Sequence, residues 1–205
     1  FDVICRTGVM NTQYVQEPHF HFSQDLFDNC PDNVSLVGYY QSPKYFNHIA
    51  DDIRYDFKFR HEYQKPCEEM MEELDNPVAL HVRRGDFITN VENHFNQTME
   101  YYEEAVKYFP NRQIVVFSDD PEWCKKTFEG DEYLVSENEN PYVDMCLMSM
   151  CSDFIIANST FSWWPAWLST NPDKIVIYPK QWFGITGYTK DHDVSDLFPE
   201  EWIKI

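Results

Sequence analysis

The residues best suited to chemistry are two adjacent arginines in the segment His81-Val82-Arg83-Arg84-Gly85-Asp86. They follow a short apolar run and precede a glycine, as expected where a buried strand ends. An arginine presents a planar fork of donors that keeps its charge and fits phosphate oxygens. Arg83 and Arg84 therefore predict a site for a phosphorylated ligand, with Asp86 holding one of them in place. The simpler alternative is a surface salt bridge between Arg84 and Asp86.

The charge balance of the chain makes these arginines conspicuous. The 205 residues include 16 Lys and Arg against 35 Asp and Glu, a net charge of −19. This acidity excludes a protein whose main task is to bind nucleic acid or an anionic membrane, since both need a basic face. No Lys or Arg lies between Lys126 and Lys174. Arg83 and Arg84 must therefore supply most of the positive charge of any anion site here.

Two helical segments add candidate polar contacts. Asn158-Ser159-Thr160 precedes one of them, where backbone N–H groups at a helix start can bind an anion. Asp144 lies one turn into another, and its carboxylate could accept N–H groups from a purine such as guanine. An acid that only favours its helix start is the simpler reading of Asp144. No C-x-x-C pair, Walker-type phosphate loop or His-Glu-x-x-His motif occurs. His19 and His21 with Asp25 could hold a metal, but their spacing is loose and solvent-facing histidines are the better reading, so no metal site is predicted.

Short apolar runs alternate with helical segments from residue 77 onward. The runs predict strands at 77–82, 113–117, 132–136, 153–157 and 174–178, and the helical segments lie at 98–109, 122–128, 141–151 and 160–169. Such alternation with short connections predicts an α/β fold, a parallel sheet with helices on both faces. Ligands bind beyond the carboxyl ends of the strands in such sheets. The arginine pair, Asp119-Asp120 and residues 158–160 should therefore gather along one rim.

The first third of the chain is less regular. Residues 34–40 predict a strand, 43–53 an amphipathic helix, and 62–74 a helix with an acidic outer face. Pro77 cannot continue that last helix. We therefore expect a boundary that separates residues 1–76 from residues 77–205.

Six cysteines and a tryptophan-rich segment have plain structural readings. The cysteines are expected to be thiols, because none is spaced as C-x-x-C and a chain of this length does not require disulfides. The segment Ser162-Trp163-Trp164 with Trp167 could be an aromatic platform for a sugar. A core helix with bulky packing is at least as good a reading of these tryptophans.

Taken together, these segments resemble a known family. The chain is similar to the α-1,2-fucosyltransferase family, glycosyltransferase family 11, in HVRRGDF (81–87), DFIIANSTFSWWPAWLS (153–169) and KIVIYPKQWF (174–183). The segments FSDDPEWCK (117–125) and VGYYQSPKYF (37–46) extend the resemblance. Family members begin with a Gly-rich GGLGNQ-like turn, which does not occur here. The chain therefore resembles an N-terminally truncated member.

The resemblance implies a GT-B-like fold and a reaction. Residues 77–205 would form a Rossmann-type domain that binds GDP-fucose, and residues 1–76 the remainder of the acceptor-side domain. L-Fucose would pass with inversion to the 2-hydroxyl of a terminal galactose in a glycan, with no cofactor and no essential metal. The alternatives are a non-catalytic GDP-sugar- or glycan-binding domain and a fucosyltransferase of α-1,6 linkage.

The resemblance also suggests a location. A bacterial member would work in the cytoplasm, which the thiol spacing and the lack of an anchor favour. An animal member would sit in the Golgi membrane, through an anchor upstream of Phe1.

Residue roles follow from the same resemblance. Arg83 would contact the diphosphate and stabilise the charge that grows on the β-phosphate, with His81 and Asp144 near guanine and Ser162 near a phosphate. The donor-binding candidates are completed by Arg84, Ser159 and Thr160. Asp86 and Glu92 are both candidates to take the acceptor's proton. If fucose leaves as a very loose cation, this base matters little.

Overall fold

The computed structural model of the chain describes residues 13–138 and 140–205. The chain divides into two compact units, residues 1–58 with 191–200 and residues 59–190 with 201–205. The assignment of residues 1–76 to acceptor binding and 77–205 to donor binding stays a prediction, because a compact unit need not match a functional domain. Within the described residues, no helix is long and apolar enough to cross a membrane.

The first unit is built from short elements. They are β1 (Tyr14–Gln16), α1 (Gln24–Asn29), β2 (Ser35–Val37) and α2 (Ala50–Asp56), with β1 parallel to β2. The predicted helix over residues 43–53 is wrong in its first half, where two 3-10 turns precede α2. Phe46 leaves the helical region between these turns. The Tyr45 hydroxyl accepts the Ser23 backbone N–H at 2.9 Å, so a long-range contact outweighs the local periodicity.

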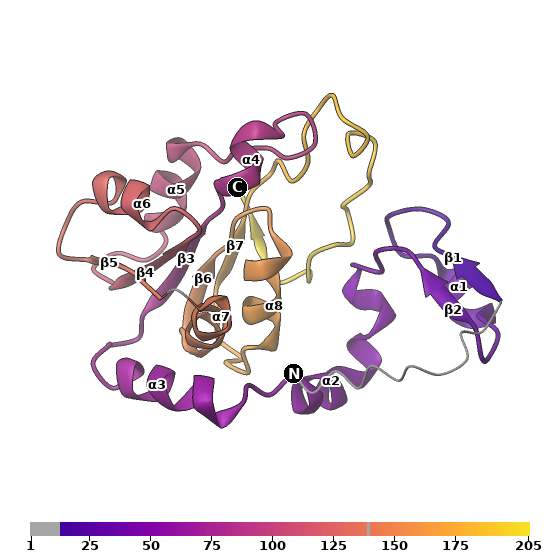
Figure 1. Cartoon of the computed structure of the whole chain (residues 1–205), viewed down its shortest axis with the longest axis horizontal. Helices are drawn as coiled ribbons and strands as arrows, with labels where there is room; N and C mark the ends of the chain where they lie inside the picture. Colours follow the sequence, from indigo (N-terminus) through magenta and orange to yellow (C-terminus); the bar gives the residue numbers. More distant parts are fainter. Residues whose placement is uncertain (1–12, 139) are drawn as a thin grey trace. The chain divides into compact units, whose positions relative to one another are not determined.

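A parallel sheet forms the centre of the second unit (Figure 1). Its strands in spatial order are β5 (Tyr133–Val135), β4 (Ile114–Ser118), β3 (Val78–Val82), β6 (Asp153–Ile155), β7 (Val176–Tyr178) and β8 (Ile203–Lys204). Every neighbouring pair is parallel. If the six strands are renumbered from 1, starting at β3, their spatial order is 3-2-1-4-5-6, which is the order of Rossmann-type folds. The predicted α/β fold is confirmed.

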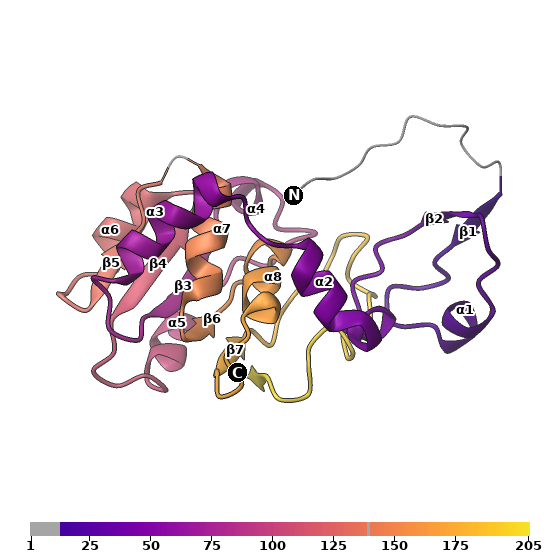
Figure 2. The same cartoon turned by 90° about the horizontal axis from the view of Figure 1, so that it is seen from below.

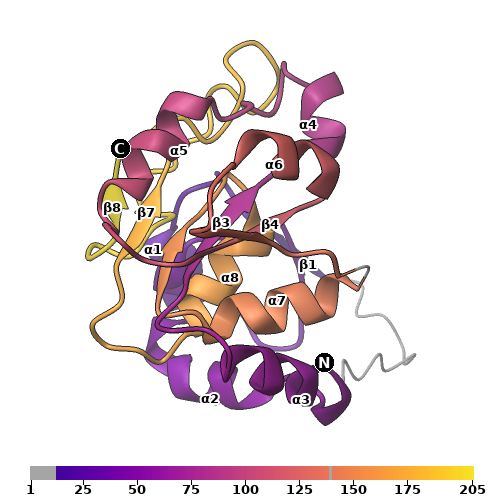
Figure 3. The ribbon, with the colours of Figure 1, turned by 90° about the vertical axis from the view of Figure 1, so that its left-hand side faces the viewer.

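Helices cover both faces of this sheet (Figure 2, Figure 3). One face carries α5 (Met99–Val106) and α6 (Pro121–Thr127), and the other carries α7 (Pro141–Met150) and α8 (Thr160–Leu168). Helix α3 (His61–Met71) packs against α7, and the short α4 (Gly85–Thr89) follows β3 directly. The helices predicted from residue 98 onward are all present.

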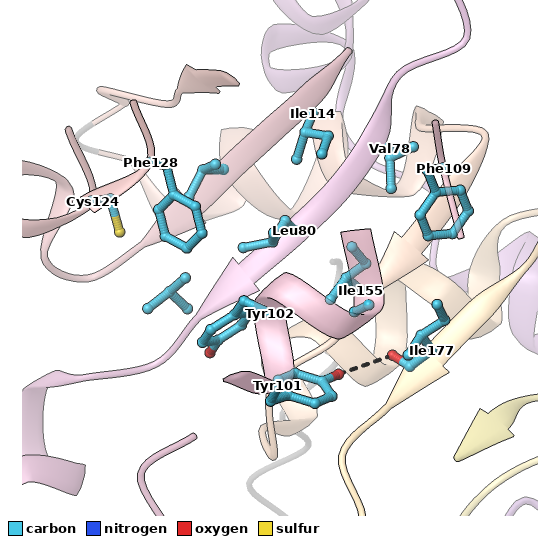
Figure 4. Close-up of a cluster of buried hydrophobic side chains, with 13 residues drawn as sticks. Val78, Leu80, Tyr101, Tyr102, Phe109, Ile114, Cys124, Phe128, Ile155 and Ile177 are labelled. Carbon is cyan, nitrogen blue, oxygen red and sulfur yellow. Dashed lines mark hydrogen bonds between the residues drawn. The ribbon is translucent and has the colours of Figure 1, made fainter. Parts of the chain in front are cut away.

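The core explains how β3 directs its side chains. Successive side chains of a strand point to opposite faces. Val78, Leu80 and Val82 join the cluster that buries Tyr102 of α5 (Figure 4). His81 therefore points to the other face, toward α8.

Candidate active site

The polar segments predicted to share one rim do so. In the observed strand order the chain reverses direction between β3 and β6, which is where Rossmann-type sheets bind their ligands. His81 to Arg84 stand at the end of β3, Asp119 and Asp120 follow β4, and residues 158–160 follow β6. Hydrogen bonds and ion pairs join Arg83 and Arg84 to Asp119 and Asp120. His81 of β3 bonds Ser162, two residues beyond Thr160.

Arg83 is held between two carboxylates. Its Nη2 donates to Asp86 Oδ1 at 2.5 Å, and its Nη1 lies 2.8 Å from Asp119 Oδ2. The guanidinium carbon also lies 5.5 Å from the centre of the Phe87 ring. The side chain nevertheless stays 33% exposed. The alternative of an Arg84–Asp86 salt bridge is wrong, because α4 begins at Gly85 and brings Asp86 to Arg83 instead.

Arg84 serves the structure of the rim. Its Nε donates to Asp120 Oδ2 at 3.0 Å, and its guanidinium carbon lies 3.9 Å from the centre of the Trp123 ring. The Arg84 hydrogen bond is the main cause that lowers the pKa of Asp120. Asp120 also caps α6 by accepting the Trp123 N–H at 3.1 Å, as its position before a proline suggests. Arg84 therefore ties the end of β3 to the start of α6.

The backbone at Arg84 and Gly85 takes part in the same arrangement. The Arg84 N–H donates to Asp119 Oδ1 at 2.9 Å. A Cβ atom at Gly85 would overlap the Asp119 carboxylate. The glycine of the R-R-G-D segment is thus explained by close packing of this carboxylate, which in turn holds Arg83.

His81 is a buried neutral base. Burial, with a further contribution from the positive charge of Arg83, lowers its pKa to about 3. Its Nδ1 lies 2.9 Å from Ser162 Oγ of α8, and that oxygen lies 3.3 Å from the Ser159 carbonyl. A hydroxyl that donates to this carbonyl must accept from the ring, which places the imidazole proton on Nδ1. Nε2 then carries the lone pair and is a hydrogen-bond acceptor.

Residues 158–160 have three different environments. Asn158 is buried, and its amide donates to the carbonyls of Phe95 and Trp182 at 2.9 and 2.7 Å. The Ser159 hydroxyl caps α8 by accepting the Phe161 N–H at 3.2 Å. Thr160 is exposed at the first position of α8. Asn158 is therefore structural, and the candidate anion contacts lie at the start of α8.

The buried side chains of α8 qualify two expectations. Ser162 is fully buried and contacts His81, so its predicted phosphate contact stays a prediction. Trp163 and Trp167 are also buried. These two tryptophans belong to the core, as the simpler reading has it.

Asp144 lies in a separate polar group at the start of α7. It is buried and accepts from Ser136 Oγ at 2.6 Å and Asn138 Nδ2 at 3.0 Å. Burial raises the pKa of Asp144, while these two hydrogen bonds act in the opposite direction. Its partners come from the connection between β5 and α7 and not from the arginine cluster. Its contact with guanine stays a prediction.

A model of Glycosyl transferase family 11 matches residues 9–205. The chain belongs to this family. It is 35% identical to the Escherichia coli O-antigen biosynthesis glycosyltransferase WbnK, with 96% of this chain and 69% of that protein covered. It is 33% identical to the Escherichia coli alpha-1,2-colitosyltransferase, with 90% and 67% covered. It is 26% identical to human galactoside alpha-(1,2)-fucosyltransferase 1, with 74% and 47% covered.

The family 11 chain spans about two thirds of these bacterial relatives and about half of the human one. Two solved structures are similar to it at low sequence identity. POFUT1 in complex with GDP is 16% identical, with a TM-score of 0.44 over 62% of this chain and 50% of that chain. NodZ alpha-1,6-fucosyltransferase soaked with GDP-fucose is 17% identical, with a TM-score of 0.41 over 58% and 45%.

The two candidate bases of this family 11 chain differ in their contacts. Asp86 is 59% exposed, but its carboxylate is bonded to Arg83. Glu92 is exposed on the loop after α4. Among the described residues, no hydrogen bond or ion pair engages its carboxylate. Glu92 is thus the one of the two whose oxygens have no guanidinium partner.

Sequence reasoning missed the polar residues that organise this loop. Gln97 Nε2 donates to Asn158 Oδ1 at 3.0 Å and to the Gln181 carbonyl at 2.7 Å. Asn93 Oδ1 accepts the Tyr188 N–H at 3.0 Å. The available signal was the pair of glycines in Phe183-Gly-Ile-Thr-Gly-Tyr188, a turn-forming pattern soon after a strand.

The described residues contain no group of three or more His, Cys, Asp and Glu arranged to hold a metal ion. Within that part of the chain the cysteines are free thiols, and Cys67, Cys124, Cys146 and Cys151 are buried. Cys5 lies outside the described residues.

Proposed function

We propose that the whole protein is an inverting glycosyltransferase that moves L-fucose from GDP-fucose to the 2-hydroxyl of a terminal galactose in a glycan. Membership of family 11 supports glycosyl transfer. The observation that carries the donor assignment is the position of Arg83, which stands partly exposed at the switch point of a Rossmann-type sheet. Nucleotide phosphates bind at such a point.

Arg83 is assigned to the leaving group. As the bond between the fucose anomeric carbon and the β-phosphate oxygen breaks, the bonding electrons pass to that oxygen and negative charge grows on the phosphate. A guanidinium already oriented by Asp86 and Asp119 stabilises this charge with little rearrangement. Arg84 is less suited, because its guanidinium is bonded to Asp120 and stacked on Trp123.

The remaining donor contacts are assigned by their hydrogen-bonding character. Nε2 of the neutral His81 and the carboxylate of Asp144 are acceptors suited to N–H groups of guanine. Ser159 and Thr160 lie at the N-terminus of α8, where backbone N–H groups favour a phosphate. Ser162 acts by holding the His81 ring.

Glu92 is assigned as the base. It would accept the proton of the galactose 2-hydroxyl as the oxygen bonds to the anomeric carbon from the side opposite GDP. Asp86 is the less suitable candidate, because its Oδ1 already accepts a hydrogen bond from Arg83 Nη2.

The test is transfer by the whole protein from GDP-fucose to a β-galactoside, followed as release of GDP. EDTA is present, since the reaction is proposed to need no metal. We expect Arg83→Ala to lower kcat/KM about a hundredfold or more, as loss of one strong transition-state contact does. Lys107→Ala is the matched control, because it removes one positive charge from an exposed side chain on α5's C-terminal side. Equal rates for the Arg83 variant and the wild type would refute the assignment of Arg83.

A second sugar is a candidate for the one that is transferred. The 33% identity to the alpha-1,2-colitosyltransferase favours GDP-colitose as an alternative donor. Parallel assays with the two donors distinguish them by kcat/KM, and linkage analysis of the product distinguishes α-1,2 from α-1,6 transfer. Binding of GDP without any turnover would indicate the non-catalytic alternative.

A further inference from the structure

Two loops at the rim of the second unit are bonded to each other along their backbones. The first loop covers residues 88–94, from the end of α4 onward. The second loop covers residues 184–189 and follows β7. The Gly184 N–H donates to the Asn93 carbonyl at 2.8 Å, and the Gly187 N–H donates to the Glu92 carbonyl at 2.7 Å. Side chains add to these bonds, since Asn93 accepts the Tyr188 N–H and its carbonyl accepts the Thr189 hydroxyl at 2.9 Å. We call these residues the loop pair.

The glycines show how closely the two loops approach. A Cβ atom at Gly184 would overlap the Glu92 carbonyl oxygen, and one at Gly187 would overlap the Asn93 side chain. Asn93 Nδ2 also donates to Asn90 Oδ1 at 2.9 Å, which fixes the turn after α4. The loop pair is therefore packed through its backbone, so the side chains that project from it have defined places.

The exposed side chains of the loop pair are unusually apolar for an acidic protein. Tyr188 and Ile185 are 71% and 74% exposed, and Ile88 and Val91 are also exposed. Val91 precedes Glu92 in the first loop, and Tyr188 follows Gly187, whose N–H donates to the Glu92 carbonyl. Single exposed apolar residues are ordinary on protein surfaces, but here four of them stand on two loops that are bonded to each other.

The first loop is connected to the donor rim along the chain. The first loop follows α4, which begins directly after Arg84 and includes Asp86, the partner of Arg83. The residues beyond it return to the sheet, where Gln97 bonds Asn158 at the end of β6. Figure 1 shows the segment after α4 beside the one that follows β7. The first loop is thus attached at both ends to elements that hold the candidate donor site, and the second loop is bonded to the first.

We propose that the loop pair binds the acceptor, taking a galactopyranose with its C–H face on the Tyr188 ring and its hydroxyls toward Glu92. This proposal rests on the proposed function. A pyranose presents one face of C–H groups and a rim of hydroxyls, so it needs an apolar aromatic surface beside hydrogen-bond acceptors. Binding sites of this composition combine aromatic side chains with a few placed polar groups. The ligand is neutral, so the net charge of −19 does not oppose it.

The test measures binding without requiring turnover. Saturation-transfer NMR is recorded with methyl β-galactoside and the whole protein in the presence of GDP, for the wild type, Tyr188→Ala, Tyr188→Phe and Tyr108→Ala. Tyr108 is the matched control, an exposed tyrosine just beyond α5. We expect saturation of the sugar C–H protons in the wild type, the Phe variant and the control, and about tenfold weaker binding in Tyr188→Ala.

An unchanged sugar signal in Tyr188→Ala overturns the proposal, as does the lack of any signal in the wild type. GDP affinity, measured on the same samples, should be equal in all four proteins. A parallel loss of GDP binding in Tyr188→Ala would mean a general structural effect and would also overturn the proposal. Turnover of GDP-fucose by the wild type decides the proposed function separately, so the two can fail independently.

Discussion

The buried His81 makes the stability of the second unit depend on pH in a way that can be calculated. In the unfolded chain its imidazole titrates near pH 6.5, whereas burial lowers its pKa to about 3 in the folded protein. Below pH 6.5 the unfolded state therefore binds a proton that the folded state does not. The stability associated with neutral His81 is fully present above pH 6.5 and is lost as the pH falls toward 3.

The magnitude follows from the size of the shift. Each pH unit in this window costs about 1.4 kcal/mol, so the full difference is about 5 kcal/mol. Lowering the pH from 7 to 5 should remove about 2 kcal/mol through this one side chain. The other histidines and the carboxylates also titrate, so the effect must be measured as a difference between two proteins.

His81→Asn is the appropriate variant. Asparagine keeps an N–H donor for Ser162 Oγ but does not titrate. Urea unfolding is followed by tryptophan fluorescence, since the six tryptophans all belong to the second unit. We expect the wild type to lose about 2 kcal/mol more than the variant between pH 7 and pH 5. Identical pH profiles would refute the depressed pKa and with it the neutral acceptor assigned to Nε2.

Two further predictions concern buried polar groups of the second unit. Arg112→Met should destabilise this unit by about 3 kcal/mol in urea unfolding, because Arg112 Nη2 lies 2.9 Å from the buried carboxylate of Asp153; an unchanged unfolding midpoint would contradict this. Asn158→Ala should cost about 2 to 4 kcal/mol, since it leaves the Phe95 and Trp182 carbonyls without their donor. If Asn158→Leu restores the stability, the loss is due to packing and not to hydrogen bonding.

The sheet was predictable where the sequence is locally apolar. Strands β3 and β4 are continuous runs of buried residues, and their ends could be read from the arginines and from Ser118-Asp119. Strand β8 is a strand only because Ile203 and Lys204 pair with β7, which no local pattern reveals. Helix α4 is five residues long, too short to show a helical period. The helix predicted at residues 43–49 is absent for the opposite reason. The sequence there has a clear helical period, but the long-range contact of Tyr45 overrides it.

The candidate site also has a part that could be predicted from the sequence and a part that could not. The rim of arginines and aspartates followed from topology, because parallel strands end on one edge and bring Arg83 within reach of Asp119. Which arginine pairs with Asp86 did not follow, since it depends on the start of α4. The contact between Tyr188 and Asn93 joins residues 95 positions apart in loops without regular structure. Nothing in either segment alone specifies that partner.

The adjacent arginines have different tasks because neighbouring residues at a strand end point in different directions. Arg84 packs on Trp123 and bonds Asp120, which fixes the end of β3 against α6. Its backbone N–H and the glycine after it hold Asp119, and Asp119 holds Arg83.

The charges at this rim extend the same argument. With Asp86, the rim has three carboxylates and two guanidiniums, a local charge of −1. Attraction by excess positive charge therefore does not explain the proposed binding of an anion. The carboxylates instead orient the Arg83 donors in advance, which is the condition under which a guanidinium contributes most to a developing charge.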